Sequence, residues 1–379
     1  MELIDLLEQH SNTVYNKHVN SKIHIHFSQD IIDITNKKPH AILLGYKENR
    51  NSTIASTLQI ADEFRVSLEK LCATSESLTI VDIGNCKQGK TVRESYIILQ
   101  EVLKILKELQ IPIIIIGGTQ ESLYYIGKEI LKKVQYPTIC CIDSKIDLDI
   151  DSEDFSNTNY ISKLVNLSET QRLISIAYQE YLSIQKTYEW FKSQYFPLVR
   201  LGKVRQNILE VEPLIRDSQI VSFDMSAIRY SDMPSQIYSN PNGLYAEESC
   251  QLAWYAGYSP NIRVFCLHDT FFNESTKVLT ATLTAQIIWH FLDGISQQKQ
   301  KKCDFSAEKF TKYYVQNSFL EQDITFFENI YTKQMWVEIP LKNKKKKRIL
   351  PCSSLDYQVF LDNNLSENWL LEFNRLYNK

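Results

Sequence analysis

Four aspartates that follow apolar segments are the residues of this chain best suited to chemistry. They share a position at the end of, or just beyond, a run of apolar residues: Asp143, Asp147, Asp224 and Asp269. Carboxylates are the ligands that hard divalent cations prefer, and closely spaced carboxyl groups can also act as general acids or bases. The sequence therefore indicates an acidic site that is assembled from distant segments.

Histidine and cysteine offer few further candidates for this site. The seven histidines stand at positions 10, 18, 24, 26, 40, 268 and 290, so none lies within 41–267. His268, next to the last aspartate, is a weak candidate for a catalytic base, because a strand-end histidine is more often a hydrogen-bonded structural residue. Cys140 and Cys141 lie in an apolar run and are expected to be buried core thiols.

An alternation of strands and helices is predicted to bring the aspartates together. Between the apolar runs, segments 94–109 and 279–291 repeat apolar residues every three or four positions, the pattern of a helix. Strands that alternate with such helices require a mostly parallel sheet covered on both faces, a three-layer α/β/α fold whose site lies at the carboxyl ends of the strands. The expected buried strands are 41–45, 78–83, 113–116, 138–142, 220–223 and 264–267.

Four strand-end segments resemble, in order and spacing, the motifs of the arginase-like ureohydrolases (arginase, agmatinase and formimidoylglutamase). The family patterns are GGxH, DAHxD, SxDxD and a late acid after a strand. The corresponding segments here are IPIIIIGGTQ, which contains Gly117 and Gly118, followed by CIDSKID, VSFDMSAI and VFCLHD. The resemblance covers about residues 41–294, is closest to formimidoylglutamase, and implies the arginase-like fold.

The resemblance also implies which residues would hold metal. In this family two histidines and four aspartates bind two manganese ions, whose bridging hydroxide attacks a guanidinium or formimino carbon. Three of these ligands are kept, namely Asp143, Asp147 and Asp224. Three are replaced: Gln120 and Lys145 stand where the motifs have histidine, and Ser226 where SxDxD has its second aspartate.

The replacements leave two unequal halves of the site. Gln120 with the three kept aspartates is an all-oxygen set that could hold one hard cation, manganese or magnesium, weakly. The other half would face Lys145 and Ser226, and an ammonium group has no lone pair for a metal. We expect Lys145 to replace the second ion by bridging Asp143 and Asp224. Asp269, where the family usually has a glutamate that grips the substrate's cationic group, is interpreted as a vestigial substrate-side acid.

Three functions are compatible with these residues. The first is a non-catalytic homologue, kept as a binding or scaffolding module for a small molecule or a protein, with no cofactor or at most one divalent cation. The second is a formimidoylglutamase-like or arginase-like hydrolase of C–N bonds in amidino or formimino compounds, using one residual metal. The third is a metal-free reaction with Lys145 as base or nucleophile, which the surrounding aspartates oppose because they hold the lysine charged.

The composition is that of an ordinary globular protein of 379 residues with a net charge of −3. Such a charge gives no reason to expect nucleic acid or an anionic membrane as a partner. The N-terminus lacks the basic start and apolar stretch of a signal peptide, and no segment is expected to resemble a membrane span. Eight cysteines without a CxxC pair favour a reducing compartment, so we expect a cytoplasmic protein.

Two regions are expected along the chain. Residues 1–294 form the arginase-like domain, and 295–379 form a C-terminal extension that packs on it, because its apolar side chains are too numerous to remain in water. Within the extension, 335–340 and 348–350 are predicted to pair across the basic turn 342–347. The family resemblance further implies a homo-oligomer.

Overall fold

A nine-stranded parallel sheet forms the centre of the molecule. The computed structural model describes residues 2–8, 23–51, 63–71, 77–169, 171–236, 238–271, 275–298, 305–306, 308–320, 323–341 and 347–377. Within these residues the strand order is β1-β3-β2-β4-β9-β8-β5-β6-β7, and every neighbouring pair is parallel. The strands are β1 (Ile23–Phe27), β2 (Ala41–Gly45), β3 (Leu78–Asn85), β4 (Ile113–Ile116), β5 (Thr138–Ile142), β6 (Arg172–Tyr178), β7 (Leu198–Arg200), β8 (Ile220–Asp224) and β9 (Val264–His268).

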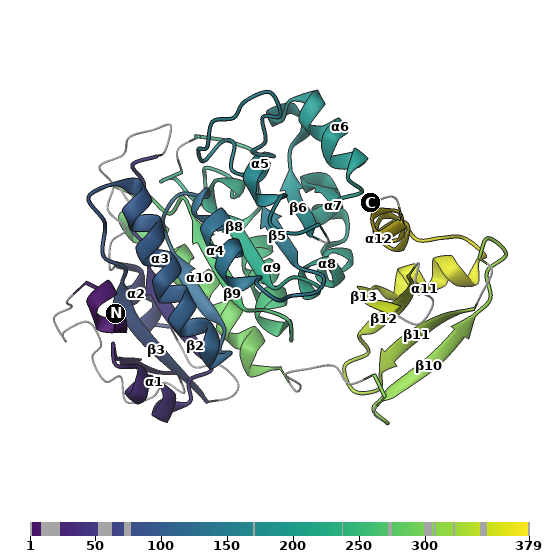
Figure 1. The fold of residues 1–379 in the computed structure, drawn as a ribbon, viewed down its shortest axis with the longest axis horizontal. Helices are drawn as coiled ribbons and strands as arrows, with labels where there is room; N and C mark the ends of the chain where they lie inside the picture. The colour runs from purple at the N-terminus through teal and green to yellow at the C-terminus, as the bar shows by residue number, and fades with distance from the viewer. Residues whose placement is uncertain are drawn as a thin grey trace.

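Helices cover both faces of this sheet, which gives the predicted three layers (Figure 1). Successive strand residues point to opposite faces, so each strand supplies both apolar layers. One face is covered by α1 (Ile31–Lys37), α3 (Val92–Leu106), α4 (Ser122–Ile130), α5 (Ile161–Leu164) and α6 (Gln185–Ser193). The other is covered by α2 (Glu63–Glu69), α7 (Leu201–Gln206), α8 (Glu212–Arg216), α9 (Ala246–Tyr258) and α10 (Lys277–Ser296).

The predicted elements match the structure closely. Strands β2, β4 and β5 have the expected bounds, and β3, β8 and β9 each continue one or two residues further. The helix expected over 94–109 is α3 followed by one 3-10 turn (Lys107–Leu109), and that expected over 279–291 is the longer α10. The three-layer α/β fold with a parallel sheet is therefore confirmed. Strands β1, β6 and β7 are additional.

Helix α10 departs from the expectation that no segment resembles a membrane span. It is long and apolar enough to cross a membrane by length and composition, with a mean hydropathy of 1.2. However, 61% of the apolar stretch of this helix is buried inside the protein. There α10 lies against α9 and α2. Its apolar character is accounted for by its place in the core.

The C-terminal extension forms a second, antiparallel sheet of four strands. These are β10 (Phe310–Val315), β11 (Ile324–Asn329), β12 (Met335–Pro340) and β13 (Lys347–Cys352), in that order. Helices α11 (Ser354–Leu361) and α12 (Glu367–Tyr377) bury Phe360 and Trp369 against one face of the sheet. Pairing of β12 with β13, from Met335 opposite Cys352 to Pro340 opposite Lys347, confirms the predicted hairpin. Most of its basic turn, 342–346, lies outside the described residues.

A buried cluster of charges joins the extension to the parallel sheet. Arg172, at the start of β6, pairs with Asp217 at 2.9 Å and with Glu372 of α12 at 3.3 Å. Arg348 of β13 reaches the same two acids, at 2.6 and 3.4 Å, and Arg375 pairs with Glu372 at 2.7 Å. Although burial opposes ionisation, Arg172 and the other two arginines hold the pKa of Glu372 down to about 2. The carboxylate is thus ionised wherever the protein is folded.

Removing the charge of Glu372 is expected to weaken this junction. Glu372→Gln removes the carboxylate that Arg172, Arg348 and Arg375 share, so the free energy of unfolding should fall by about 3–5 kcal/mol, as for other broken buried ion pairs. Urea denaturation measures this change. On the same helix Glu367, whose side chain is 78% exposed and pairs with Lys203 at 3.6 Å, provides the control, and Glu367→Gln should change stability by less than about 0.5 kcal/mol. Equal effects of the two substitutions would contradict the buried cluster's role.

Candidate metal and ligand site

The candidate residues follow four strands that are adjacent in the sheet. Strands β4, β9, β8 and β5 are consecutive in the order, and their carboxyl ends meet at one edge. Gln120 follows β4, Asp143 follows β5, Asp224 ends β8 and Asp269 follows β9. The sheet therefore gathers at one place side chains that are up to 149 positions apart in the sequence, the separation from Gln120 to Asp269.

Two glycines shape the turn that begins this edge. Gly117 and Gly118 both adopt positive φ, 90° and 68°, a region that side chains disfavour. Their backbone continues the sheet, since Gly117 donates to Leu267 O at 2.8 Å and Gly118 O accepts from the Asp269 N–H at 3.0 Å. A Cβ on Gly118 would lie 2.4 Å from the Tyr46 ring. The glycine pair is thus required by backbone geometry and by the close approach of Tyr46.

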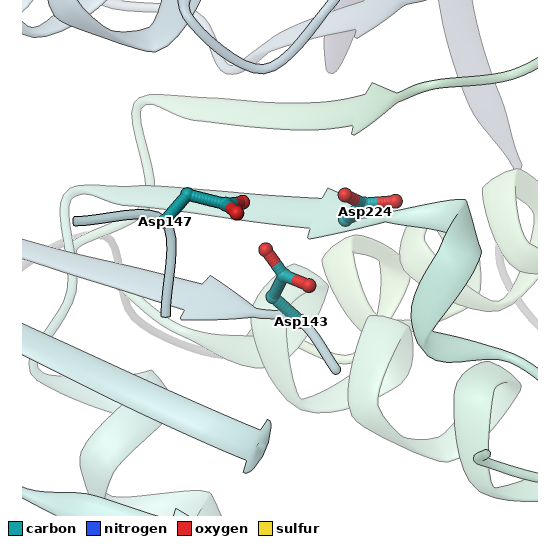
Figure 2. Close-up of side chains that lie close together, drawn as sticks. All are labelled: Asp143, Asp147 and Asp224. Carbon is teal, nitrogen blue, oxygen red and sulfur yellow. The ribbon is translucent and has the colours of Figure 1, made fainter. Parts of the chain in front are cut away.

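The three aspartates that the chain keeps from the metal motifs converge. One carboxyl oxygen from each of Asp143, Asp147 and Asp224 lies within 4.8 Å of the others. Figure 2 shows Asp143 at the end of β5, Asp224 at the end of β8, and Asp147 reaching toward Asp224 from the loop after β5. Asp143 and Asp224 are buried, and Asp147 is partly buried. This set of oxygens can hold one metal ion.

Local hydrogen bonds orient two of these carboxyl groups. Asp143 Oδ1 accepts the backbone N–H of Lys145 at 2.9 Å, and Asp224 Oδ1 accepts that of Ser226 at 2.6 Å. Each aspartate thereby closes an Asx turn, in which its side chain accepts the backbone N–H two positions further on. The second oxygen of Asp143 is buried and accepts no hydrogen bond from the described residues. That oxygen is available to a proton or a cation.

Burial and mutual repulsion raise the pKa of every carboxyl group in this cluster. Burial is the largest cause throughout. It places the pKa of Asp147 at about 7, with Asp224 adding to the effect, and the pKa of Asp224 at about 8, with Asp143 adding to it. The pKa values of Asp143 and Asp269 rise well above the usual range for the same reasons. Without a cation, this cluster holds protons at neutral pH.

Lys145 occupies a different position from the one expected. Its ammonium lies 3.6 Å from the centre of the Tyr238 ring, and within the described part of the chain it forms no ion pair with Asp143 or Asp224. The expected direct bridge is therefore wrong. The Lys145 backbone is held in the turn closed by Asp143, and its ammonium contacts the Tyr238 ring in the wall of the same cavity. Its charge still lowers the pKa values of Asp147 and Asp224.

Gln120 lies against the Asp143 carboxyl group, yet neither polar atom of its buried amide completes a hydrogen bond of ordinary geometry. The next residue, Glu121, is a site carboxyl that the sequence motifs do not identify. It is fully buried and accepts hydrogen bonds from Thr119 at 2.6 Å and Tyr96 at 2.8 Å, and its other oxygen has no partner in the described part of the chain. Burial raises its pKa. Its position directly after the GGTQ turn was the one sequence feature that could have identified it as a site residue.

His268 is a structural residue. It is fully buried at the end of β9, and its two ring nitrogens lie 3.1 Å from Ser122 Oγ and 2.9 Å from Ser222 Oγ. Burial lowers its pKa to about 3, so the ring is neutral. Both nitrogens are engaged, which favours the structural reading over a catalytic base. Cys140 and Cys141 are buried free thiols with raised pKa values, as expected for core residues.

The cavity at this edge is small. Its free volume is ≈ 10 Å³, about the space that one water molecule needs. Ser226 and Tyr238 contribute to its walls, together with Asn157 and Thr158 from the loop after β5. The remaining lining residues are Asp143, Lys145, Asp147, Asp224 and Asp269. An ion or a water molecule fits this space, whereas a substrate does not without movement of the walls.

Solved structures of ureohydrolases share this fold. No protein-family model and no curated protein sequence matches the chain. Formimidoylglutamase from Bacillus subtilis is similar with a TM-score of 0.65 and 18% identity over 78% of this chain and 98% of that chain. Formiminoglutamase from Trypanosoma cruzi, solved with Mn²⁺, has a TM-score of 0.61 and 16% identity over 69% and 94%. An agmatine ureohydrolase from Thermoplasma volcanium gives 0.58 and 15% over 69% and 91%.

These similarities establish the class of fold. The chain has the arginase-like ureohydrolase fold, as the strand-end motifs predicted. The structures that it resembles include formimidoylglutamases as well as an agmatine ureohydrolase. At these levels of identity the likeness concerns the fold, and the chemistry of the site has to be argued from the residues present.

The raised pKa values predict that the metal-free protein loses stability as the pH rises. Asp147 and Asp224 have folded pKa values of about 7 and 8 against an ordinary value of 3.8, so the folded state binds more protons than the unfolded state between these limits. This stabilisation is complete below the ordinary value, declines with rising pH, and is lost above about pH 8. The melting temperature of chelator-treated protein across this range measures it. In Asp224→Asn the decline should be shallower, and an unchanged profile would contradict the assignment.

Substitution of Gly118 should destabilise the fold. Gly118→Ala places a Cβ at positive φ and against Tyr46, and we expect a loss of about 1–3 kcal/mol in the free energy of unfolding. Urea denaturation is the measurement. Gly202 of α7 is the matched control, because a Cβ there meets nothing within 4 Å, and Gly202→Ala should be neutral or stabilising by up to about 1 kcal/mol. Equal behaviour of the two variants would refute the proposed constraint.

Proposed function

We propose that this protein is a ureohydrolase-fold binding or scaffolding module that lacks a dinuclear manganese centre. It does not hydrolyse guanidino or formimino compounds. The substituted half of the site carries this proposal. Where the family motifs have a histidine and an aspartate for the second ion, this chain has Lys145, which cannot coordinate a metal, and Ser226, which has no charge.

The surroundings of Lys145 support the loss of the second ion. Its ammonium is stabilised by the Tyr238 ring and lies close enough to Asp147 and Asp224 to lower their pKa values. A positive charge in this position repels a second cation. Together with a free volume of ≈ 10 Å³, it leaves no room for two ions and a substrate.

The other half of the site fits a single hard cation. Asp143, Asp147 and Asp224 supply oxygens within 4.8 Å of one another, and the buried Gln120 amide beside them has no hydrogen-bond partner among the described residues. Manganese or magnesium suits such a set. When bound, one ion would offset most of the charge of the carboxylates and lower the pKa of a water molecule. We propose at most one divalent cation, held weakly.

The second candidate function is a hydrolase of C–N bonds in amidino or formimino compounds that uses this single ion. The convergence of three aspartates favours it, as does Asp269, whose carboxyl group lines the same cavity. The cation–π contact of Lys145 opposes a third candidate, a metal-free reaction on that lysine, because it stabilises the charged amine. The protein is proposed to be cytoplasmic, to form a homo-oligomer, and to have a small molecule or another protein as its partner, without nucleic acid or membrane.

Metal content and activity distinguish the first two functions. Protein purified with excess manganese should retain no more than about one ion per chain by elemental analysis. It should also be inactive toward formiminoglutamate, arginine and agmatine. Turnover of one of these with a single bound ion would favour the hydrolase, whereas two tightly bound manganese ions would overturn both proposals. Lys145→Met should raise manganese affinity, because it removes the repelling charge while preserving most of the side chain.

The reverse substitutions provide the matched test. Gln120→His, Lys145→His and Ser226→Asp together restore the family's ligand types, so manganese content should rise toward about two ions per chain. A control with the same residue changes at exposed positions, Gln135→His, Lys104→His and Ser193→Asp, should not alter it. If the restored variant folds and still binds no additional ion, the inferred correspondence of these positions with metal ligands is wrong.

A further inference from the structure

A second, larger cavity lies between the parallel-sheet domain and the C-terminal extension. Its volume is ≈ 670 Å³, within the range of small-molecule sites. Apolar side chains form most of its wall, among them Val199, Val211 and Leu214 from the domain, and Leu355, Val359 and Leu371 from α11 and α12. We call this cavity the junction groove. It lies apart from the aspartates, since β7, α7 and the following turns line it and the four site strands do not.

The N-terminus of α12 opens onto the junction groove. Leu365, Ser366, Glu367 and Asn368, the residues around the helix start, all line it. The first N–H groups of a helix have no acceptor within the helix and carry partial positive charge. Ser366, directly before the helix, is only 4% exposed, and its Oγ has no hydrogen-bond partner among the residues that the structure describes. A serine in this position normally caps the helix, but the Ser366 hydroxyl forms no such bond with the described residues and faces the groove.

A lysine adds a full positive charge at the same end. Lys203 of α7 lines the groove, and its ammonium lies 3.6 Å from the Glu367 carboxylate. Both side chains are largely exposed, at 61% and 78%, so this ion pair is weak and easily exchanged. Two other acids, Glu210 and Asp356, also line the groove, and both interact with Ser353 at the start of α11. Asp356 accepts the Ser353 N–H at 2.8 Å.

We propose that the junction groove binds a small carboxylic acid with an apolar body. The carboxylate lies at the start of α12, where it accepts hydrogen bonds from the first-turn N–H groups and the Ser366 hydroxyl and replaces Glu367 as the partner of Lys203. The apolar body lies between α11 and the wall formed by Val199, Val211 and Leu214. Charge complementarity sets the ligand class, because an anion meets the helix end and the ammonium together.

Octanoate is the probe for this site, with octylamine and octanol as matched compounds of the same chain length. Calorimetric titration of the full-length protein should show saturable binding of octanoate, and much weaker binding of the amine and the alcohol. Lys203→Met should weaken octanoate binding by about tenfold or more, the effect of losing one charge-assisted hydrogen bond. Glu367→Gln should strengthen it, because it removes the competing carboxylate.

Two further variants separate binding from folding. Ser366→Ala should weaken octanoate binding without lowering the melting temperature, because no hydrogen bond of the free protein is lost, whereas a capping serine would cost about 1 kcal/mol of stability. Leu355→Trp should fill the groove and abolish binding. Leu361→Trp on the same helix is its control, since both leucines are about half exposed, at 53% and 51%, and Leu361 does not line the groove.

Three results would overturn this proposal. Absence of saturable octanoate binding would show that the groove is not a carboxylate site. Equal or tighter binding of octylamine would assign it to cations, through the acids of the α11 wall. Octanoate binding that is unaffected by both Lys203→Met and Leu355→Trp would place the ligand elsewhere on the protein. None of these results depends on the metal content of the aspartate cluster.

Discussion

Parallel pairing of the four central strands is the constraint on which the site depends. Because β4, β9, β8 and β5 run in the same direction, their carboxyl ends share one edge, and residues far apart in sequence meet there. The pairing continues beyond the strands, through the hydrogen bonds of Gly117 with Leu267 and of Asp269 with Gly118. Residues of the loops beyond the strands line this edge, and Asp143, Asp224 and Asp269 are buried there.

Burial then forces the protein to balance charge, and it does so differently in two places. At the junction with the extension, Arg172, Arg348 and Arg375 surround Glu372, which stays ionised. At the strand ends the ammonium of Lys145 lies among several carboxyl groups, but its direct contact is with the ring of Tyr238. The aspartates must therefore keep protons or accept a cation. Protonation or a bound cation would relieve the repulsion among these carboxyl groups.

The C-terminal extension supplies one wall of the junction groove, through α11 and α12. The buried ion pairs of Arg172 and Arg375 with Glu372 hold α12 against the start of β6. Its N-terminus is thereby fixed beside α7, and the junction groove forms between them. The small volume at the aspartates and the larger one at this junction suit different ligands, an ion in the first and a molecule with an apolar body and a carboxylate in the second.

The sequence by itself determined the fold class, most of the central strands and the acids that meet at their ends. Uninterrupted apolar runs such as 113–116 and 138–142 encode buried strands, and the glycine pair marks a turn that other residues cannot adopt. Strand β6 was less evident, because it begins with Arg172, whose charge becomes tolerable in the core only beside Asp217 and Glu372. Ion partners of this kind are separated by tens to hundreds of positions and leave no local pattern.

Side-chain direction, in contrast, was decided by the tertiary structure. Motif spacing placed Lys145 among the aspartates, and it does line their cavity, but its ammonium contacts the Tyr238 ring and forms no ion pair with Asp143 or Asp224 within the described residues. Likewise, Glu121 becomes a member of the cluster through burial, and Ser366 stands beside a groove that exists only once α12 is docked. Sequence periodicity reports which residues avoid water, whereas the partner of each polar group depends on where distant backbone segments meet.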